Sequence, residues 1–186
     1  MNETTLKYVL ITKDNLSEAT KFQNEVFPNN DAYRNYYESV FNLRDAEYYL
    51  VYNESQLVGF VGLYYEKVDL ESAWLGWFGV KEEFRRQHYG TRIIKFFEDL
   101  AKEKGYKYVR LYTDKNNNDV AIKFYEKCGY FAEKYENKDD QKSLETEVLI
   151  FSKSLSNNEC PKWNNKTIHL TEQYEKEKYR KQLAHK

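Results

Sequence analysis

Cysteine and histidine are scarce in this sequence. It contains 2 Cys and 3 His among 186 residues. Cys128 and Cys160 do not form a Cys-x-x-Cys pair, and with the scattered histidines they are poorly placed for a metal cluster. We therefore expect no bound metal and a reducing compartment.

Long apolar runs and an excess of charge of one sign are also missing. The first ten residues, with Glu3 and Lys7, are too polar for a signal peptide or a membrane span, so we expect a cytoplasmic protein that does not enter a membrane. The net charge is -1, which argues against a strongly basic nucleic-acid binder. Lysine and tyrosine are interleaved, as single-strand binding would require, but Asp and Glu are interspersed among the lysines. Solvated helix faces are the better interpretation, and we expect no nucleic-acid partner.

Aromatic residues, by contrast, are abundant. The sequence has 18 Tyr, 11 Phe and 3 Trp. Such side chains bury large areas, so a core can form despite a mean hydropathy of -0.90. A chain of 186 residues is long enough for one well-buried core and too short for two full domains.

Hydrophobic periodicity divides the chain into helices and strands. Apolar residues at helical spacing predict helices over residues 16–26, 32–43, 91–104 and 119–127. Alternating patterns predict strands over residues 7–12, 47–52, 56–65, 73–80, 108–113, 130–135 and 146–151. The second and third of these strands are expected to form an antiparallel hairpin. The order of the elements indicates an α/β sheet of mixed direction covered by helices.

The character of the sequence changes after residue 151. Residues 152–159 are polar and linker-like, and residues 171–186 are charged with a thin apolar stripe that is consistent with a helix. We predict one domain over residues 1–151 and a partly helical C-terminal extension over residues 152–186. The extension either covers one side of a site, exchanges with a partner subunit in a homodimer, or stays mobile.

The richest local pattern is a strand, a short charged loop and a strong helix over residues 74–91. The helix N-terminus offers unpaired N–H groups and the positive end of its dipole, which together bind anions. Gly90 allows a ligand to approach the backbone closely, while Arg85 and Arg86 add positive charge. A diphosphate would fit this loop, although the same pattern by itself more often marks a solvated loop.

The loop resembles the signature of the GNAT superfamily of N-acetyltransferases, which is Arg/Gln-x-x-Gly-x-Gly/Ala at a strand-to-helix turn. Here the signature reads Arg85-Arg86-Gln87-His88-Tyr89-Gly90, and Val80 ends the preceding strand as in the family. His88 replaces the first glycine of the signature. It either narrows the loop, brings an imidazole near the ligand, or is an ordinary solvated residue.

A second resemblance lies downstream, in residues 118–130. This stretch is similar to the family's Asn-x-x-Ala-x-x-Phe-Tyr-x-Lys-x-Gly-Phe/Tyr helix, with Asn118, Ala121, Tyr125 and Gly129 at matching positions. The resemblance implies a mixed, mostly antiparallel central sheet flanked by helices, with a splayed strand pair that receives acyl-CoA.

The resemblance implies acetyl-CoA as the co-substrate. The backbone of Phe78 and Val80 would bond to the pantetheine arm as to an added strand. The diphosphate would lie against the loop and the helix start at Arg85, Arg86, Gln87, His88, Tyr89, Gly90 and Thr91. Asn118 would touch the arm or hold its loop. Tyr125 would contact the cofactor and act as the catalytic acid that protonates the leaving thiolate, while a backbone N–H near Phe78 would stabilise the oxyanion.

The resemblance leaves the general base and the acceptor open. Many members carry a Glu before the diphosphate loop at the position that Trp74 occupies here, and an indole cannot take that proton. Either Glu66, Asp69 or Glu71 acts through water, or the site binds the neutral amine; a solvated turn charge is the simpler interpretation of each carboxylate. Trp74 and Tyr64 either line an aromatic acceptor pocket or belong to the core.

From these motifs we expect an acetyl-CoA-dependent N-acetyltransferase. An acceptor amine, of a small molecule more readily than of a protein, would attack the thioester directly. The alternative is a module that binds CoA without catalysis, which the departures at Trp74 and His88 keep open.

Overall fold

The computed structural model describes residues 5–28, 32–42, 45–116, 118–140, 143 and 146–168. The helix predicted over residues 171–186 lies outside these residues. The chain divides into two compact units. The first unit comprises residues 1–64 and 75–97, and the second comprises residues 65–74 and 98–186.

The strands of the first unit are antiparallel. β1 (Leu6–Leu10) pairs with β2 (Ala46–Asn53), β2 pairs with β3 (Gln56–Glu66), and the short β5 (Gly79–Val80) also pairs with β3. The predicted hairpin is therefore confirmed. Its turn places Glu54 in the left-handed region, with φ of 55°.

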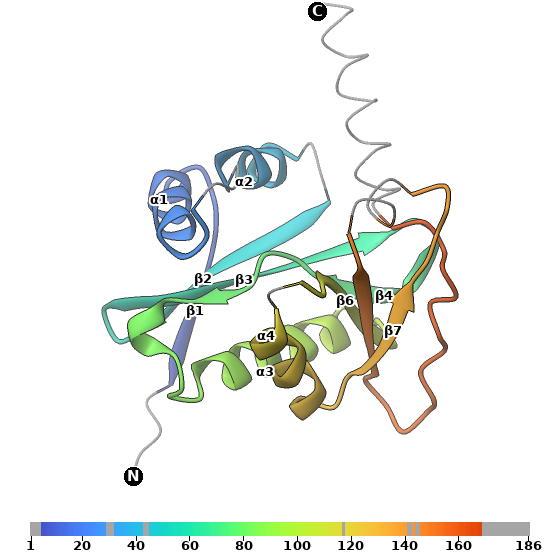
Figure 1. Ribbon diagram of the computed structural model, residues 1–186. Coiled ribbons are helices and arrows are strands. Elements are labelled where there is room, and N and C mark those ends of the chain that lie inside the picture. The colour runs from blue at the N-terminus through green and yellow to red at the C-terminus, as the bar shows by residue number, and fades with distance from the viewer. Residues whose placement is uncertain are drawn as a thin grey trace, which may run out of the picture. The chain divides into compact units, whose positions relative to one another are not determined.

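Two helices cover one face of these strands, α1 (Leu16–Val26) and α2 (Ala32–Val40), drawn in blue in Figure 1. Phe22 of α1 meets Phe60 of β3 edge-on, with ring centroids 6.1 Å apart. Burying a side chain of this size stabilises the fold by about 1.5–3 kcal/mol. The core of this face takes residues from α1, α2, β2 and β3 and one that follows β1: Ile11, Leu16, Ala19, Phe22, Tyr36, Tyr48, Leu50 and Phe60.

The opposite face of the same strands packs against the first half of α3 (Tyr89–Glu103). Phe96 stacks on Tyr8 of β1 with centroids 3.7 Å apart and meets Tyr49 of β2 edge-on at 5.3 Å. Successive side chains of a strand point to opposite faces, so Tyr49 lies on the face away from Tyr48. One strand thereby anchors helices on both of its faces.

The last strand predicted before the charged loop is interrupted. β4 (Asp69–Leu75) ends before Gly76, and the chain resumes pairing at Gly79. The N–H of Gly76 donates to Gly62 O at 2.8 Å, and Gly79 lies opposite Phe60. The step from Gly76 to Gly79 is one residue longer than the facing step on β3. This extra residue is a bulge, which bends the chain and changes the direction of its backbone.

The second unit orders its strands as β4, β6 (Tyr108–Asp114), β8 (Val148–Ser154) and β7 (Phe131–Tyr135). β8 is antiparallel to both of its neighbours. β4 and β6 are parallel, and their pairing is short, with residues 72–74 of β4 opposite residues 108–110 of β6. Beyond this point β6 continues beside β8 to Asp114. Across the described residues the strands are thus mixed and mostly antiparallel, and the expected fold class is confirmed.

Part of the predicted C-terminal extension is packed into the second unit. β8 ends at Ser154, three residues past the expected boundary at residue 151. Trp163 is 1% exposed, and its ring meets that of Trp74 edge-on with centroids 4.9 Å apart. The first residues of the extension therefore share the core of this unit. No helix in the described part of the chain is both long and apolar enough to cross a bilayer.

Candidate functional site

The loop between β5 and α3, together with the first turn of α3, contains most of the predicted cofactor residues. It leaves β5 at Val80, passes through a 3-10 turn at Glu82–Phe84 and enters α3 at Tyr89. The helix begins two residues earlier than the predicted start at Thr91. Tyr89, Gly90 and Thr91 consequently form its first turn.

This first turn of α3 has the chemistry of an anion site. The N–H of Arg92 donates to His88 O at 3.2 Å and closes the first turn of the helix. The N–H groups of Tyr89, Gly90 and Thr91 precede that bond, so none of them has an acceptor within the helix. The helix dipole adds partial positive charge at the same place. A diphosphate oxygen could therefore accept several backbone hydrogen bonds here.

Two residues of the loop have left-handed backbone conformations. Arg86 has φ of 61° and His88 has φ of 63°. Such a conformation costs a residue with a side chain about 1–2 kcal/mol, and histidine is among the residues that adopt it more often. His88 stands where the signature has its first glycine. A positive φ at this position explains why the signature has a glycine there. The substitution puts an exposed imidazole at this position, and the backbone stays in the left-handed conformation.

Arg85 and Gln87 hold the loop from within. Arg85 Nε donates to Val80 O at 3.0 Å, and Gln87 Nε2 donates to Glu83 O at 3.0 Å. These side chains fix the path of the backbone between β5 and α3. The positive charge of Arg85 is thereby held at the end of β5.

Phe78 and Val80 lie on the bent segment that follows β4. Lys81 N–H donates to Val58 O at 3.0 Å, and Val80 lies opposite Gly59. Because hydrogen-bonded and non-bonded pairs alternate along an antiparallel ladder, the backbone N–H and C=O of Val80 point away from β3. A Cβ on Gly59 would lie only 2.6 Å from Gly79 O, so glycine permits the close approach of the two strands. The outward edge of β5 is suited to an added strand.

Asn118 lies in the second unit, immediately before α4 (Asp119–Lys127). Its Nδ2 donates to Asp114 O at 2.7 Å, and its backbone O accepts the N–H of Ile122 at 2.9 Å. These contacts hold the loop between β6 and α4, which is one of the two roles expected of Asn118.

Tyr125 lies in α4 and is 8% exposed. Its ring packs on Phe151 of β8, with centroids 5.5 Å apart, and on Tyr130 at 6.1 Å. Burial, with a smaller contribution from Cys128, raises the pKa of the Tyr125 hydroxyl above its ordinary value. The hydroxyl is therefore protonated at neutral pH, as a group that donates a proton to a thiolate must be.

The three carboxylates considered as a base have different surroundings. Asp69 Oδ2 lies 3.3 Å from Arg110 Nε, and Glu71 forms an ion pair with Lys107. Each of these two carboxylates thus lies beside a cation. Glu66 is fully buried at the end of β3. Of the three candidates, Glu66 is the one whose position is least like a solvated turn.

Trp74 and Tyr64 are both buried, with exposures of 0% and 5%. Trp74 packs against Trp163 in the core of the second unit, and Tyr64 lies in the first unit opposite Ala46. Contact between Trp74 and an acceptor would require an opening in this packing. A role of either residue in acceptor binding stays a prediction.

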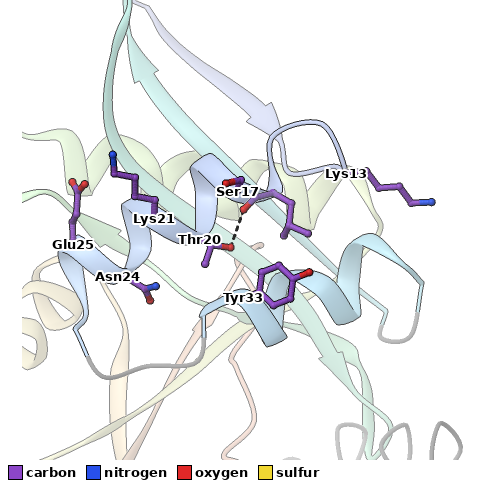
Figure 2. A pocket seen from close by; sticks show the side chains of 8 residues that line it. Lys13, Ser17, Thr20, Lys21, Asn24, Glu25 and Tyr33 are labelled. Atoms are coloured by element: carbon purple, nitrogen blue, oxygen red, sulfur yellow. Dashed lines mark hydrogen bonds between the residues drawn. The ribbon is translucent and has the colours of Figure 1, made fainter. Parts of the chain in front are cut away.

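An open hollow lies on the outer surface of α1 and α2, as Figure 2 shows. Within it Thr20 Oγ1 donates to Leu16 O at 2.8 Å. The residues that line it are Lys13, Leu16, Ser17, Thr20, Lys21, Asn24, Glu25 and Tyr33. None of the predicted site residues lines this hollow, so we assign it no part in cofactor binding.

Sequence analysis missed a polar cluster at the end of α4. Lys153 of β8 forms an ion pair with Glu98 of α3, and both belong to the second unit. The available signal was Glu98, a charged residue beside the apolar stripe of its helix, between Phe97 and Ala101. Its partner lies 55 positions away in sequence, which no local pattern indicates.

The sequence matches the model of the acetyltransferase (GNAT) family over residues 14–130, more than half of the chain. The chain belongs to this family. The match includes the loop before α3 and the helix that carries Tyr125. Membership confirms the resemblance drawn from the two motifs, and the expected enzyme class, acyltransferase, is confirmed at the level of the family.

Individual relatives agree with this assignment. The protein named "Probable N-acetyltransferase 14" of Xenopus tropicalis is 36% identical over 80 residues, which cover 43% of this chain and 38% of that protein. A GNAT-family protein of Desulfovibrio desulfuricans has a similar structure, with a TM-score of 0.69 at 10% identity, covering 82% of this chain and 100% of that one. NAA60 of Arabidopsis thaliana, solved with acetyl-CoA, has a TM-score of 0.63 at 16% identity and covers 81% and 98%. At these identities the two structures establish the shared fold.

Proposed function

We propose that the chain transfers the acetyl group of acetyl-CoA to the amine of a small molecule. The observation that carries this proposal is the first turn of α3, where three N–H groups precede the first intrahelical bond. These groups lie at the residues that match the family signature. The acetyl-CoA in the NAA60 structure supports the same co-substrate for this chain.

Binding would use the backbone of the first unit. The N–H groups of Tyr89, Gly90 and Thr91 would take the diphosphate, and Arg86 would add an exposed positive charge. The outward N–H of Val80 would donate to the pantetheine arm, and its C=O, which also accepts from Arg85 Nε, would contribute its second lone pair. Bound acetyl-CoA supplies an activated thioester.

The reaction would proceed by direct attack. The acceptor nitrogen forms a bond to the thioester carbonyl carbon, and the carbon–sulfur bond then breaks. A backbone N–H near Phe78, after the bulge, would donate to the carbonyl oxygen as negative charge develops there. Tyr125 would give its proton to the departing sulfur. The proton that the nitrogen loses passes to water or to Glu66, and a proton from solvent restores Tyr125.

One observation favours a second function, a module that binds CoA without catalysis. The position at which many family members place a Glu holds Trp74, which is 0% exposed. Asp69 and Glu71, two of the alternative bases, are each paired with a cation. If Glu66 does not act either, only an amine that arrives in its neutral form could react.

The test combines turnover with binding. Purified protein is given acetyl-CoA and a broad panel of small amines, and the release of free CoA thiol is followed, while calorimetry measures acetyl-CoA affinity. We expect thiol release with at least one amine. Replacement of Tyr125 by Phe removes the donor and keeps the ring, so turnover should fall by about 10²-fold or more with little change in acetyl-CoA affinity.

The outcomes separate the two functions. Acetyl-CoA binding with no turnover on any amine supports the inactive module. Absence of binding overturns both proposals. A Tyr125→Phe variant with the wild-type rate contradicts the role of Tyr125 and leaves transfer itself standing.

A further inference from the structure

A shielded ion pair lies at the C-terminal end of α4. Lys153 Nζ donates to Glu98 Oε1 and Oε2 at 2.8 and 2.9 Å and to Cys128 O at 2.8 Å. These acceptors match the three donors of an ammonium group. Glu98 is 9% exposed, so removal of the lysine would leave a largely buried carboxylate without its cation.

The same ammonium completes the cap of α4. The helix ends at Lys127, and Gly129, two residues later, has φ of 87°. The N–H of Tyr130 donates to Tyr125 O at 3.1 Å, and the N–H of Gly129 donates to Glu126 O at 3.0 Å. This is the Schellman arrangement, in which the carbonyl of Tyr125 is part of the cap. Lys153 binds the carbonyl of Cys128, the C-cap residue, and adds positive charge where the helix dipole is negative.

The helix depends on such contacts for its position. α4 has 9 residues, and isolated helices of that length are not stable in water. Its place is therefore set by packing, and its last turn is held by Lys153 of β8 and, through Glu98, by α3. Tyr125 lies in this last turn, with its ring on Phe151 of the same strand β8.

We propose that Lys153, held by Glu98, is a positioning residue that fixes the hydroxyl of Tyr125 for proton donation. This inference rests on the proposed function, in which Tyr125 is the acid. Lys153 acts through the helix backbone, by fixing the end of α4 against β8 and α3. It takes no part in proton transfer itself.

The expected effect follows from the sensitivity of catalysis to geometry. A displacement of about 1 Å from the productive position can cost about 10²-fold in rate. Lys153→Met keeps the apolar stem and removes the ammonium, so we expect kcat to fall by about 10-fold to 10²-fold. The KM for acetyl-CoA should change by less than about twofold, because the diphosphate loop belongs to the other unit. Lys153→Arg, which keeps the charge, should recover part of kcat.

A double-mutant cycle tests whether the effect passes through Tyr125. In the Tyr125→Phe background, Lys153→Met should lower kcat by less than about twofold, because the hydroxyl that it positions is already absent. Lys134→Met is the matched control. Lys134 lies on β7 and forms an exposed ion pair with Glu136, and its loss should leave kcat unchanged.

A second measurement reports on the tyrosine itself. Protein labelled with ¹³C at the tyrosine Cζ gives a resonance for Tyr125, assigned by its disappearance in Tyr125→Phe. We expect Lys153→Met to shift or broaden this resonance in protein that remains folded by circular dichroism, and Lys134→Met to leave it unchanged. This readout does not require an acceptor amine.

The results separate failure of the inference from failure of the proposed function. A Lys153→Met variant with wild-type kcat and an unchanged Tyr125 resonance overturns the inference. An equal fall of kcat in the wild-type and Tyr125→Phe backgrounds also overturns it, because the lysine would then act elsewhere. If the wild-type protein turns over no amine, the proposed function falls, and the resonance still decides whether Lys153 fixes Tyr125.

Discussion

Arg110 ties the segment after β8 to the strands of the second unit, and its replacement by Met tests how firmly that segment is held. The side chain is 1% exposed. Its Nε donates to Ser72 Oγ at 3.0 Å and lies 3.3 Å from Asp69 Oδ2. Its Nη1 donates to Ser152 Oγ at 2.6 Å, and its Nη2 donates to Pro161 O at 2.9 Å. The last of these bonds reaches into the predicted C-terminal extension.

The magnitude follows from these contacts. Removing one partner of a buried ion pair costs about 3–5 kcal/mol. Three hydrogen bonds from a charged group, at about 1.5–3 kcal/mol each, would give a larger sum. In the variant, however, the surrounding structure relaxes and water enters the site, which recovers part of the lost free energy. We therefore expect Arg110→Met to lower the free energy of unfolding by about 3–5 kcal/mol. At about 2–4 °C per kcal/mol for a chain of this length, Tm should fall by about 6–20 °C.

Urea unfolding followed by tryptophan fluorescence measures this loss, because Trp74 and Trp163 are in contact in the same unit. The matched control is Lys115→Met, which removes an exposed ion pair with Glu147 and should leave the urea midpoint almost unchanged. Trypsin should also cleave after Lys162 faster in the Arg110→Met variant. A loss as small as that of the control, with unchanged cleavage, would refute the reasoning.

Three further predictions concern the loop and the tyrosines. Gly90→Asp puts a carboxylate into the first turn of α3, so it should stabilise the helix by about 0.3–1 kcal/mol and yet weaken acetyl-CoA binding at least tenfold; calorimetry with undiminished affinity would contradict the diphosphate site. His88→Gly should relieve about 1–2 kcal/mol of backbone strain, offset by about 0.5–1 kcal/mol of added chain entropy, and should keep or improve acetyl-CoA affinity. Weaker binding by His88→Gly would instead indicate an imidazole contact with the ligand. Burial raises the pKa of Tyr8 to about 12 and, together with a hydrogen bond to Glu18, that of Tyr52 to about 12. Unfolded tyrosine ionises near pH 10, so this contribution to stability is complete below about pH 10 and is lost as the pH rises toward 12. The urea midpoint should therefore be lower at pH 11 than at pH 9, and equal midpoints would rule out this linkage.

The sequence was sufficient for the features that depend on neighbours along the chain. The first turn of α3 was predicted within two residues, since a charged loop before an apolar helical stripe is a local pattern. The helix predicted over residues 119–127 has the same bounds in the structure for the same reason, and Gly129 after it has the positive φ that favours glycine. The substitution of His88 in the signature was also visible, although its left-handed backbone was not.

The features missed or misplaced depend on residues far apart in sequence. The break in the strand before the loop follows from the register against β3, where Gly76 bonds to Gly62. Alternation of side chains within one strand contains no information about that register. The packing of Trp163 on Trp74 was missed because the polar residues after β8 resemble a linker when only their composition is considered.

By itself, the sequence determined the family, the position of the loop that we expect to bind the diphosphate, and the helix that carries Tyr125, because each of these features depends on a short run of residues. Only the tertiary structure decided what surrounds Tyr125. Its raised pKa comes from burial, and the cap of its helix is completed by Lys153 on β8, which Glu98 on α3 holds. Burial and ion pairing are properties of groups brought together by folding, and no local pattern specifies which distant side chain arrives.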